Sequence, residues 1–412
     1  MIVLRGIGRA FTAGEKGVVA RAAIICQRDQ IMWVGPERDL DSALADEPVG
    51  VGRDEEIEEH DCGGALVTPG LVDAHAHPLY AGERFAEIAA RSAGAGYLAI
   101  AQAGGGISAT VQATRAASSR TLRDALTTRL RAWLAGGTTS VEAKTGYHLD
   151  EEGELSALRL LAELARSGTA SEHPLPRIDV TFLGAHAVPP ERAGNQSGYV
   201  DDVVSWCGPA AVAGARHCDV FCDEGYFTVE ESRRILHAGR QAGLLARLHA
   251  DELARTGGAM LAAEIGALSA DHLLLIDETD ARALAAAGVT ATLAPTTALS
   301  MGHSPPARAL LDAGAHLALA TDHNPGTCGT TSMSLVVSLA ITGLGLSVDE
   351  ALVAATAGGA RSLGHRDRGR IEAGMLADLV EWDADHEGAF GWAYGLRPRR
   401  IWLGGNRISV RG

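Results

Sequence analysis

The stretch of residues 70–80, GLVDAHAHPLY, is the starting point for interpreting the whole chain. It reads as a short apolar strand that ends in His75 and His77, two histidines one residue apart. Alternate side chains of a strand lie on one face, so both imidazoles should point the same way. Such a pair is either half of a metal site or two buried histidines that happen to alternate, and the stretch alone leaves both interpretations open.

Other short β-like runs further along the chain also end in titratable or metal-binding side chains. These are Lys144, Tyr147, His186, His249, Glu252, His272 and Asp322. A lone histidine near a strand end is usually a hydrogen-bonded core residue, but a whole series of strand ends carrying such groups is hard to explain by packing. In a closed parallel barrel, functional side chains gather at the C-terminal ends of the strands. The series therefore predicts one shared site.

Helical patterns separate these runs from about residue 69 to residue 366. Alternation of strands and helices over that length favours a parallel α/β architecture, and we expect a (β/α)8 barrel of the TIM type. Residues 1–68 and 367–412 look instead like short paired strands with turns. We therefore expect a small composite β-sandwich domain, built from both termini, beside a barrel of residues 69–366.

The composition narrows the class of protein. The chain has 412 residues and a net charge of −15, which argues against nucleic acid or an anionic membrane as a partner. Its six cysteines show no CxxC spacing and are typical of reduced, buried thiols. The N-terminus lacks the layout of a signal peptide, and no apolar run approaches the roughly 20 residues of a membrane helix. We expect a cytoplasmic protein.

The residue types at the strand ends favour metal-dependent hydrolysis. Three imidazoles and one carboxylate suit one Zn²⁺ or Fe²⁺ ion with a position left for water, whose pKa such an ion lowers to about 7. The candidate ligands are His75, His77, His249 and Asp322. Glu252 lies three residues after His249, close enough to move a proton to a leaving nitrogen. His272 and Asp322 are candidates to orient the water or accept its proton, and His272 is also a candidate to polarise a carbonyl.

With these motifs the sequence resembles the mononuclear branch of the amidohydrolase superfamily. The motifs are PGLVDAHAH (69–77), HADE (249–252), SADH (269–272) and ATDHNPG (320–326). Within that branch the chain is most similar to the imidazolonepropionase family over nearly its whole length. The more specific stretches are AQAGGGI (101–107) and KTGYHLD (144–150). The resemblance implies hydrolysis of the lactam ring of 4-imidazolone-5-propanoate to N-formimino-L-glutamate, and a homodimer.

The same resemblance implies which residues bind this small anionic heterocycle. Arg84 would hold the propanoate carboxylate, since a guanidinium binds carboxylates in a bidentate manner. Tyr97 and Tyr147 would contact the carboxylate and the ring, and His186 would hydrogen-bond a ring carbonyl or nitrogen. Three further substrate-binding candidates follow Asp322 in the chain, namely Asn324, Gly326 and Thr327.

The chain departs from the family pattern in two places. The segment LAPTTALSMGHSPP (293–306) carries Thr296 and Thr297 where the family has small and aromatic residues, which alters the expected shape of the pocket. His323 stands where the family has cysteine. Its side chain either reaches the metal or points into the barrel wall, and we favour the wall.

Alternatives to these assignments also follow from the residues. Lys144 is expected to form an ion pair rather than to bridge two metals as a carbamylated lysine, and Cys222 is expected to be a buried thiol rather than a ligand. One alternative function is that the same machinery opens or deaminates another small anionic heterocycle, because one fold hosts many substrates. A catalytically inactive binding protein on the same barrel is the remaining alternative.

Overall fold

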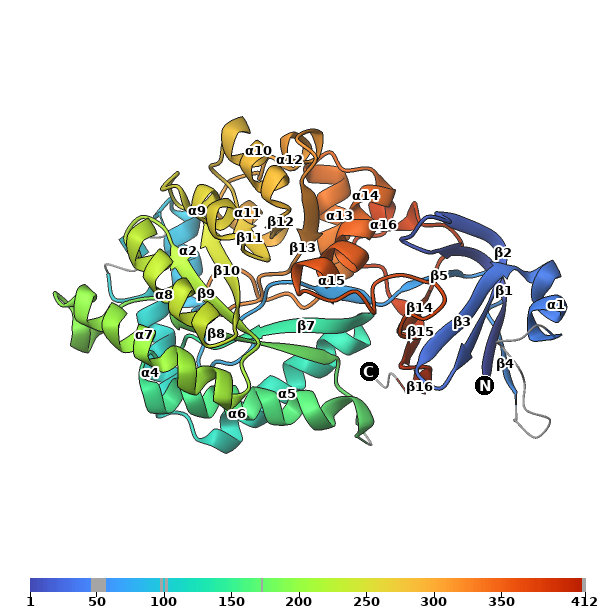
Figure 1. Ribbon diagram of the computed structural model, residues 1–412, viewed down its shortest axis with the longest axis horizontal. Coiled ribbons are helices and arrows are strands. Elements are labelled where there is room, and N and C mark those ends of the chain that lie inside the picture. Colours follow the sequence, from blue (N-terminus) through green and yellow to red (C-terminus); the bar gives the residue numbers. More distant parts are fainter. Residues whose placement is uncertain (46–56, 97–98, 101–102, 172, 410–412) are drawn as a thin grey trace.

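The computed structural model describes residues 1–45, 57–96, 99–100, 103–171 and 173–409, and it has two lobes (Figure 1). Tyr97 therefore lies outside the described residues. The larger lobe contains a parallel eight-stranded sheet in the order β13-β12-β11-β10-β9-β8-β7-β6. Its strands are β6 (Leu71–Asp73), β7 (Thr138–Lys144), β8 (Arg177–Ala185), β9 (His217–Cys222), β10 (Leu245–Ala250), β11 (Ser269–His272), β12 (Thr290–Leu293) and β13 (His316–Leu319).

The first and last strands of this sheet meet and nearly close the barrel. The backbone N–H of Asp322 donates to the carbonyl of His75 at 3.0 Å, and that of His77 donates to the carbonyl of His323 at 2.8 Å. An isolated parallel bridge joins Ala76 and His323 at the same seam. The predicted barrel is confirmed, and its seam brings together chain segments almost 250 residues apart.

Helices surround the barrel, and the longer amphipathic ones pack an apolar face against it. In α5, Leu122, Leu126 and Leu130 recur every four residues and are buried against the sheet. The helices of this lobe are α2 (Ala86–Ser92), α4 (Gly106–Ala116), α5 (Ser119–Ala135), α6 (Glu151–Ser167), α7 (Gln196–Ala213), α8 (Val229–Gln241), α9 (Gly258–Ile265), α10 (Glu278–Ala287), α11 (Pro295–Ser300), α12 (Ala307–Asp312), α13 (Met333–Gly343), α14 (Val348–Val353), α15 (Gly359–Ser362) and α16 (Ala389–Trp392). Shorter turns are η2 (Gly168–Ala170), η3 (Pro190–Arg192) and the π-helical η4 (Ala354–Gly358). We find no helix in the described part of the chain that is long and apolar enough to cross a membrane.

The smaller lobe is a β domain that both ends of the chain build together, as expected. Its strands are β1 (Ile2–Phe11), β2 (Val18–Gln27), β3 (Gln30–Pro36), β4 (Glu58–Asp61), β5 (Leu66–Pro69), β14 (Leu379–Trp382), β15 (Pro398–Leu403) and β16 (Asn406–Ile408), with η1 (Glu37–Asp39) and α1 (Leu40–Ala45) beside them. They hydrogen-bond into one sheet in which β5 joins β1 to β14. Neighbouring residues Val3 and Leu4 belong to separate apolar clusters, as strand alternation requires. The exact domain limits, 1–68 with 367–412 and 69–366, stay a prediction.

Candidate active site

The predicted site residues that the structure describes lie together at the C-terminal end of the barrel. His75, Tyr147, His186, Glu252 and Asp322 follow a strand end by one to three residues, whereas His249 lies inside β10 and His272 ends β11. A cavity of about 30 Å³ at this end of the barrel is lined by His77, Arg84, Ile107, Tyr147, His186, Phe221, His249, Glu252, His272, Asp322, Asn324 and Thr327. That volume holds about one water molecule.

Four donor atoms in this region have the spacing of a metal site. The Nε2 atom of His77 lies 3.2 Å from Nε2 of His75 and 3.3 Å from Nε2 of His249. Asp322 Oδ1 lies 3.6 Å from Nε2 of His75 and 3.5 Å from Nε2 of His77. A tetrahedral zinc ion with bonds of 2.0–2.1 Å would need donors about 3.4 Å apart. These spacings, which link each of the four side chains to at least one other, are compatible with a divalent metal.

Burial prepares the histidines to be ligands. It lowers the pKa of His75 and of His77 well below the usual value, with smaller contributions from nearby cations. Both imidazoles are therefore neutral near pH 7, the form in which a ring nitrogen can bind a metal. His272 also places a ring nitrogen within 4.8 Å of donor atoms of His75 and His249, so it lies at the edge of the same cluster.

Two buried aspartates stand behind the candidate ligands. Asp271 Oδ2 lies 2.7 Å from His75 Nδ1 and accepts a hydrogen bond that leaves Nε2 to face the centre. Asp219 Oδ2 lies 3.1 Å from His249 Nδ1, at an angle outside hydrogen-bond geometry. Carboxylates in this position orient metal-binding imidazoles and raise their basicity.

A layer of buried charges holds those aspartates in place. The Lys144 Nζ atom lies 2.6 Å from Asp219 and 2.9 Å from Glu142, and Arg247 lies 2.9 Å from Glu142 and 3.3 Å from Asp271. All five side chains are at most 1% exposed. Burial alone would lower the pKa of Lys144, but Asp219 and Glu142 raise it above the usual value, so the ammonium stays charged. Lys144 thus forms the buried ion pair that we expected.

No sequence pattern pointed to Asp219 and Asp271. Asp219 lies inside β9, where most residues are hydrophobic, and Asp271 lies in the four-residue strand β11, directly before His272. A carboxylate in a buried strand rarely lacks a partner, so the position of each aspartate in the sequence could have indicated a buried ion pair or hydrogen bond. Only the tertiary structure shows that each aspartate lies behind a histidine of the candidate metal site.

The segment 293–306, which differs from the family pattern, contains the helix α11. Its Thr297 contacts the predicted metal ligand Asp322. The Thr297 hydroxyl donates to Asp322 Oδ2 at 2.7 Å, and the residue is fully buried. This bond occupies one carboxylate oxygen and leaves Oδ1 facing the histidines. Burial raises the pKa of Asp322 to about 7, and the bond from Thr297 opposes that rise.

Replacing Thr297 by valine is expected to weaken metal binding about 10- to 100-fold, the usual effect of losing a hydrogen bond to a ligand. Serine at the same position should retain most of the affinity because it keeps the hydroxyl. Competition with a chelator on metal-free protein measures the dissociation constant. Thr296→Val is the matched control, since the Thr296 hydroxyl donates to the carbonyl of Thr321 instead of a ligand. Equal metal affinity in Thr297→Val and wild type would contradict the role.

Glu252 and His272 lie together on the wall of the cavity. Oε1 of Glu252 is 3.5 Å from Nδ1 of His272. Burial, with the nearby carboxylates of Asp322 and Asp223, raises the pKa of Glu252 well above the usual value. Nε2 of His272 is buried and has no hydrogen-bond partner among the residues that the structure describes.

Two of these residues have unusual backbone conformations. His272 has φ of 75° and Asp322 has φ of 49°, both in the left-handed region that disfavours residues with a Cβ. Such strain costs on the order of 1–3 kcal/mol and persists where surrounding contacts fix the residue. Residues in such conformations cluster at functional sites, which agrees with the predicted roles of both side chains.

His186 and Tyr147 cover the centre from the side. The His186 ring stacks on His77 with centroids 5.0 Å apart, and its Nδ1 lies 2.9 Å from the carbonyl of Gly146. That carbonyl accepts only from an N–H, so Nε2 carries the free lone pair while the ring is neutral. Burial lowers the pKa of His186 to about 3, which keeps the ring neutral. Tyr147 packs against the His77 and His186 rings.

Arg84 reaches the cavity from the loop that follows the His75–His77 pair. Glu87 binds its guanidinium in a bidentate manner, with two N–H···O contacts of 2.8 Å. A Cβ at Gly326 would collide with the Arg84 guanidinium, so only glycine allows this packing. Glu87 also accepts from the backbone N–H of Gly106 at 2.8 Å, which ties α2 to the start of α4.

Three further residues considered in the sequence, Asn324, His323 and Cys222, form contacts of their own. The Asn324 side chain donates to the carbonyl of Asp322 and to the Thr327 hydroxyl, and it accepts from two backbone N–H groups of its own loop. It therefore shapes the loop as well as lining the cavity. The ring nitrogens of His323 contact Tyr80 and the carbonyl of residue 330, in the barrel wall. Burial raises the pKa of the Cys222 thiol to about 11, so it is a neutral thiol near pH 7.

Comparison with known proteins identifies relatives along nearly the whole chain. Residues 81–389 match the model of the Amidohydrolase family. An imidazolonepropionase of Anaeromyxobacter dehalogenans is 42% identical over 382 residues, covering 92% of this chain and 88% of its own. The imidazolonepropionase of Cereibacter sphaeroides is 39% identical over 410 residues and covers 98% of both chains.

Solved structures share the fold at low sequence identity. A zinc-bound adenosine deaminase from Xanthomonas campestris superposes with a TM-score of 0.71 at 19% identity, covering 98% of this chain and 92% of its own. An atrazine chlorohydrolase from Arthrobacter aurescens, in complex with zinc, gives a TM-score of 0.71 at 19% identity, with coverage of 99% and 95%. At this identity the likeness is evidence for the fold alone.

Proposed function

The chain belongs to the imidazolonepropionase family of amidohydrolases and hydrolyses the lactam ring of 4-imidazolone-5-propanoate in histidine degradation, and we propose how its own residues perform this reaction. The observation that carries the proposal is the convergence of four metal-competent donors, in which neighbouring donor atoms lie 3.2–3.6 Å apart. The same cavity contains Arg84, a cation suited to the substrate carboxylate.

The proposed metal ligands are His75, His77, His249 and Asp322. A single zinc or iron ion held there supplies Lewis acidity, which makes a water molecule reactive near neutral pH. Between the two metals we favour zinc, because three imidazoles and one carboxylate at tetrahedral spacing suit it well.

The ring opening needs one proton to leave the attacking water and one to reach the departing ring nitrogen. The proposed acceptor of the first proton is the Asp322 carboxylate, whose Oδ2 accepts a hydrogen bond from Thr297. Glu252, whose pKa burial raises well above the usual value, delivers a proton to the nitrogen as the C–N bond breaks. His272 turns its unpartnered Nε2 toward the carbonyl oxygen and stabilises the charge that develops there.

Other side chains would hold the substrate still. Arg84 binds the propanoate carboxylate, and Gly326 leaves room for its guanidinium. His186 accepts a hydrogen bond from a ring N–H through Nε2, because its Nδ1 is engaged with Gly146. Tyr147 packs beside the ring, and Asn324 fixes the loop that carries Thr327. A contact with Tyr97 remains part of the proposal.

Steady-state assays test the substrate assignment. We expect ring opening of imidazolone propanoate and much slower turnover of hydantoin propanoate and of aminated heterocycles. Elemental analysis of the purified enzyme distinguishes zinc from iron and gives the number of ions per chain. Turnover of another heterocycle with none of imidazolone propanoate would overturn the assignment while leaving the hydrolase class intact.

Replacing Arg84 by glutamine is expected to lower kcat/KM about 10- to 100-fold, mainly through KM. The physical reason is that hydrogen bonds to a charged group contribute roughly 1.5–3 kcal/mol. Steady-state kinetics measure this loss, and an imidazolone without the propanoate chain is the control substrate. Wild type and variant should turn over that control at similar rates. An equal loss on both substrates would show that Arg84 supports the structure and does not recognise the carboxylate.

We also propose a cytoplasmic location, supported by six cysteines that are all free and buried, as in reducing compartments. For assembly we propose a homodimer. The side chains of Trp392 and Tyr394 are 84% and 58% exposed, which is unusual for aromatic residues outside an interface. Sedimentation of the purified protein would measure the assembly.

A further inference from the structure

A larger cavity lies next to the metal cavity and shares lining residues with it. Its volume is about 610 Å³, and Arg84, Asn324 and Thr327 line both spaces. Because ligand pockets commonly span about 300–1,000 Å³, a small heterocycle fits the outer cavity, whereas the inner one of about 30 Å³ is too small in this conformation. We call the outer cavity the vestibule.

Three arginines line the vestibule, and two of them are already engaged. Arg84 is bound by Glu87, and Arg129 donates to backbone carbonyls and lies 3.5 Å over the Tyr80 ring. Arg91, on α2, is different. It is partly buried, its Nε is covered without a hydrogen bond, and its side chain forms no ion pair with any residue of the described ranges.

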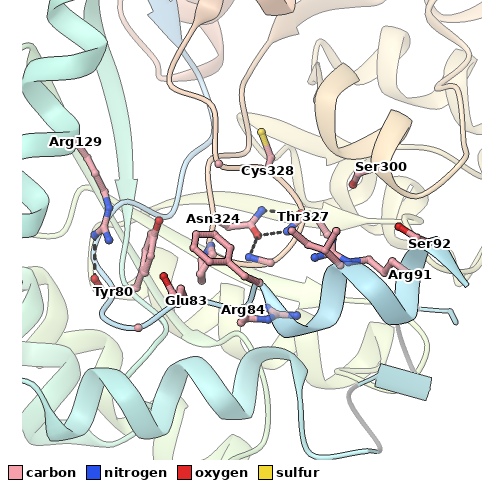
Figure 2. A pocket seen from close by; sticks show the side chains of 16 residues that line it. Tyr80, Glu83, Arg84, Arg91, Ser92, Arg129, Ser300, Asn324, Thr327 and Cys328 are labelled. Carbon is pink, nitrogen blue, oxygen red and sulfur yellow. Dashed lines mark hydrogen bonds between the residues drawn. The ribbon is translucent and has the colours of Figure 1, made fainter.

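Figure 2 shows where Arg91 lies in the vestibule. Its side chain leaves α2 beside Ser92, at the end of the pocket where Thr327 and Ser300 also lie. The hydroxyls of Ser92 and Thr327 come from separate chain segments, α2 and the loop after β13, whereas the Ser300 hydroxyl donates to the carbonyl of Thr297 at 2.9 Å. Hydroxyl donors around a guanidinium form a suitable environment for a carboxylate.

The charge of the vestibule differs from that of the protein. The chain has a net charge of −15, yet among the described residues that line this space the only carboxylate is Glu83, against three arginines. An anionic substrate approaching a strongly acidic protein is repelled overall, so a locally cationic mouth raises its concentration there. Arg91, whose guanidinium is partly desolvated and forms no ion pair within the described ranges, is the group best placed to do this.

We propose that Arg91, with the nearby hydroxyls, forms an anion-binding subsite that receives the substrate carboxylate in the vestibule before Arg84 takes it over in the metal cavity. This inference rests on the proposed function, because it assumes a substrate that carries a carboxylate. The order of the two arginines follows from the cavities. Arg84 lines both spaces, whereas Arg91 lines only the outer one.

Kinetics of Arg91→Gln at several ionic strengths test the subsite. We expect kcat/KM to fall about 3- to 10-fold at low salt with kcat unchanged, and the difference to shrink as salt screens the charge. Arg91→Lys should recover part of the loss. Arg166→Gln on the exposed face of α6 removes the same charge far from the vestibule and is the matched control. A kcat/KM equal to that of Arg166→Gln, or a loss confined to kcat, would overturn the subsite.

Binding of glutarate to the metal-loaded enzyme gives a readout that does not depend on turnover. Isothermal titration should show that Arg91→Gln binds this dicarboxylate about 3- to 10-fold more weakly than wild type or Arg166→Gln, matching the expected loss in kcat/KM. Equal affinities would overturn the subsite even if the enzyme opens imidazolone propanoate. Suppose that Arg91→Gln binds glutarate more weakly but the wild-type enzyme does not turn over imidazolone propanoate. That result would support the subsite and contradict the substrate assignment.

Discussion

Replacing Glu252 by glutamine is expected to lower kcat about 10²- to 10⁴-fold, the range that general acid–base catalysis contributes. Glutamine has nearly the same shape and still hydrogen-bonds, but it cannot carry a proton to the ring nitrogen. The metal content should not change, because Glu252 is outside the four proposed ligands. Steady-state kinetics with elemental analysis of the same samples measure both quantities.

The control for Glu252 is Glu264→Gln, which removes an exposed carboxylate on α9. It should keep wild-type kcat. A kcat within tenfold of wild type in the Glu252 variant would assign the proton transfer elsewhere, to Asp322 or His272. If the variant lost its metal, Glu252 would have to be counted among the groups that hold the ion.

Replacing Lys144 by methionine is expected to destabilise the fold by about 3–5 kcal/mol, the usual consequence of removing one partner of a buried ion pair. Lys144 is fully buried between Asp219 and Glu142, so its loss leaves two carboxylates away from water near one remaining cation, Arg247. Denaturant unfolding of the metal-free protein measures the free energy of unfolding without a contribution from metal binding.

The exposed pair Arg123–Glu163 provides the comparison for Lys144. Arg123→Met should cost at most about 1 kcal/mol, since water solvates the charge that remains. If Lys144→Met were no more destabilising than Arg123→Met, Asp219 or Glu142 would have to take up a proton in the folded state. A pH titration of the stability of the Lys144 variant would then reveal that proton.

The candidate metal ligands were predictable because, in a parallel barrel, residues at the C-terminal ends of successive strands lie close together in space. His75, His77, His249 and Asp322 each follow or end an apolar run, and parallel strands bring such ends to one rim. Residues whose contacts depend on side-chain direction were not predictable in the same way. Asn324 was expected to contact the substrate, yet its amide atoms are engaged by its own loop.

The segment 293–306 illustrates the same difference. Its sequence indicated only that the pocket differs from the family pattern, and nothing in it pointed to a hydrogen bond between Thr297 and Asp322. The two residues are 25 positions apart and meet because α11 begins close to the end of β12, which lies beside β13. Likewise, Glu87 became relevant only when its carboxylate was found on Arg84.

By itself, the sequence determined the alternation of strands and helices, the terminal β domain, the family and the donors of the proposed metal site. These depend on local periodicity and on the rule that strand ends converge. Only the tertiary structure decided the partners of the buried charges, such as Lys144 between Asp219 and Glu142, and the position of Arg91, which forms no ion pair within the described residues. Such partners come from strands and loops far apart in the chain, and the low polarity of the interior makes each pairing depend on distances that no periodic pattern encodes.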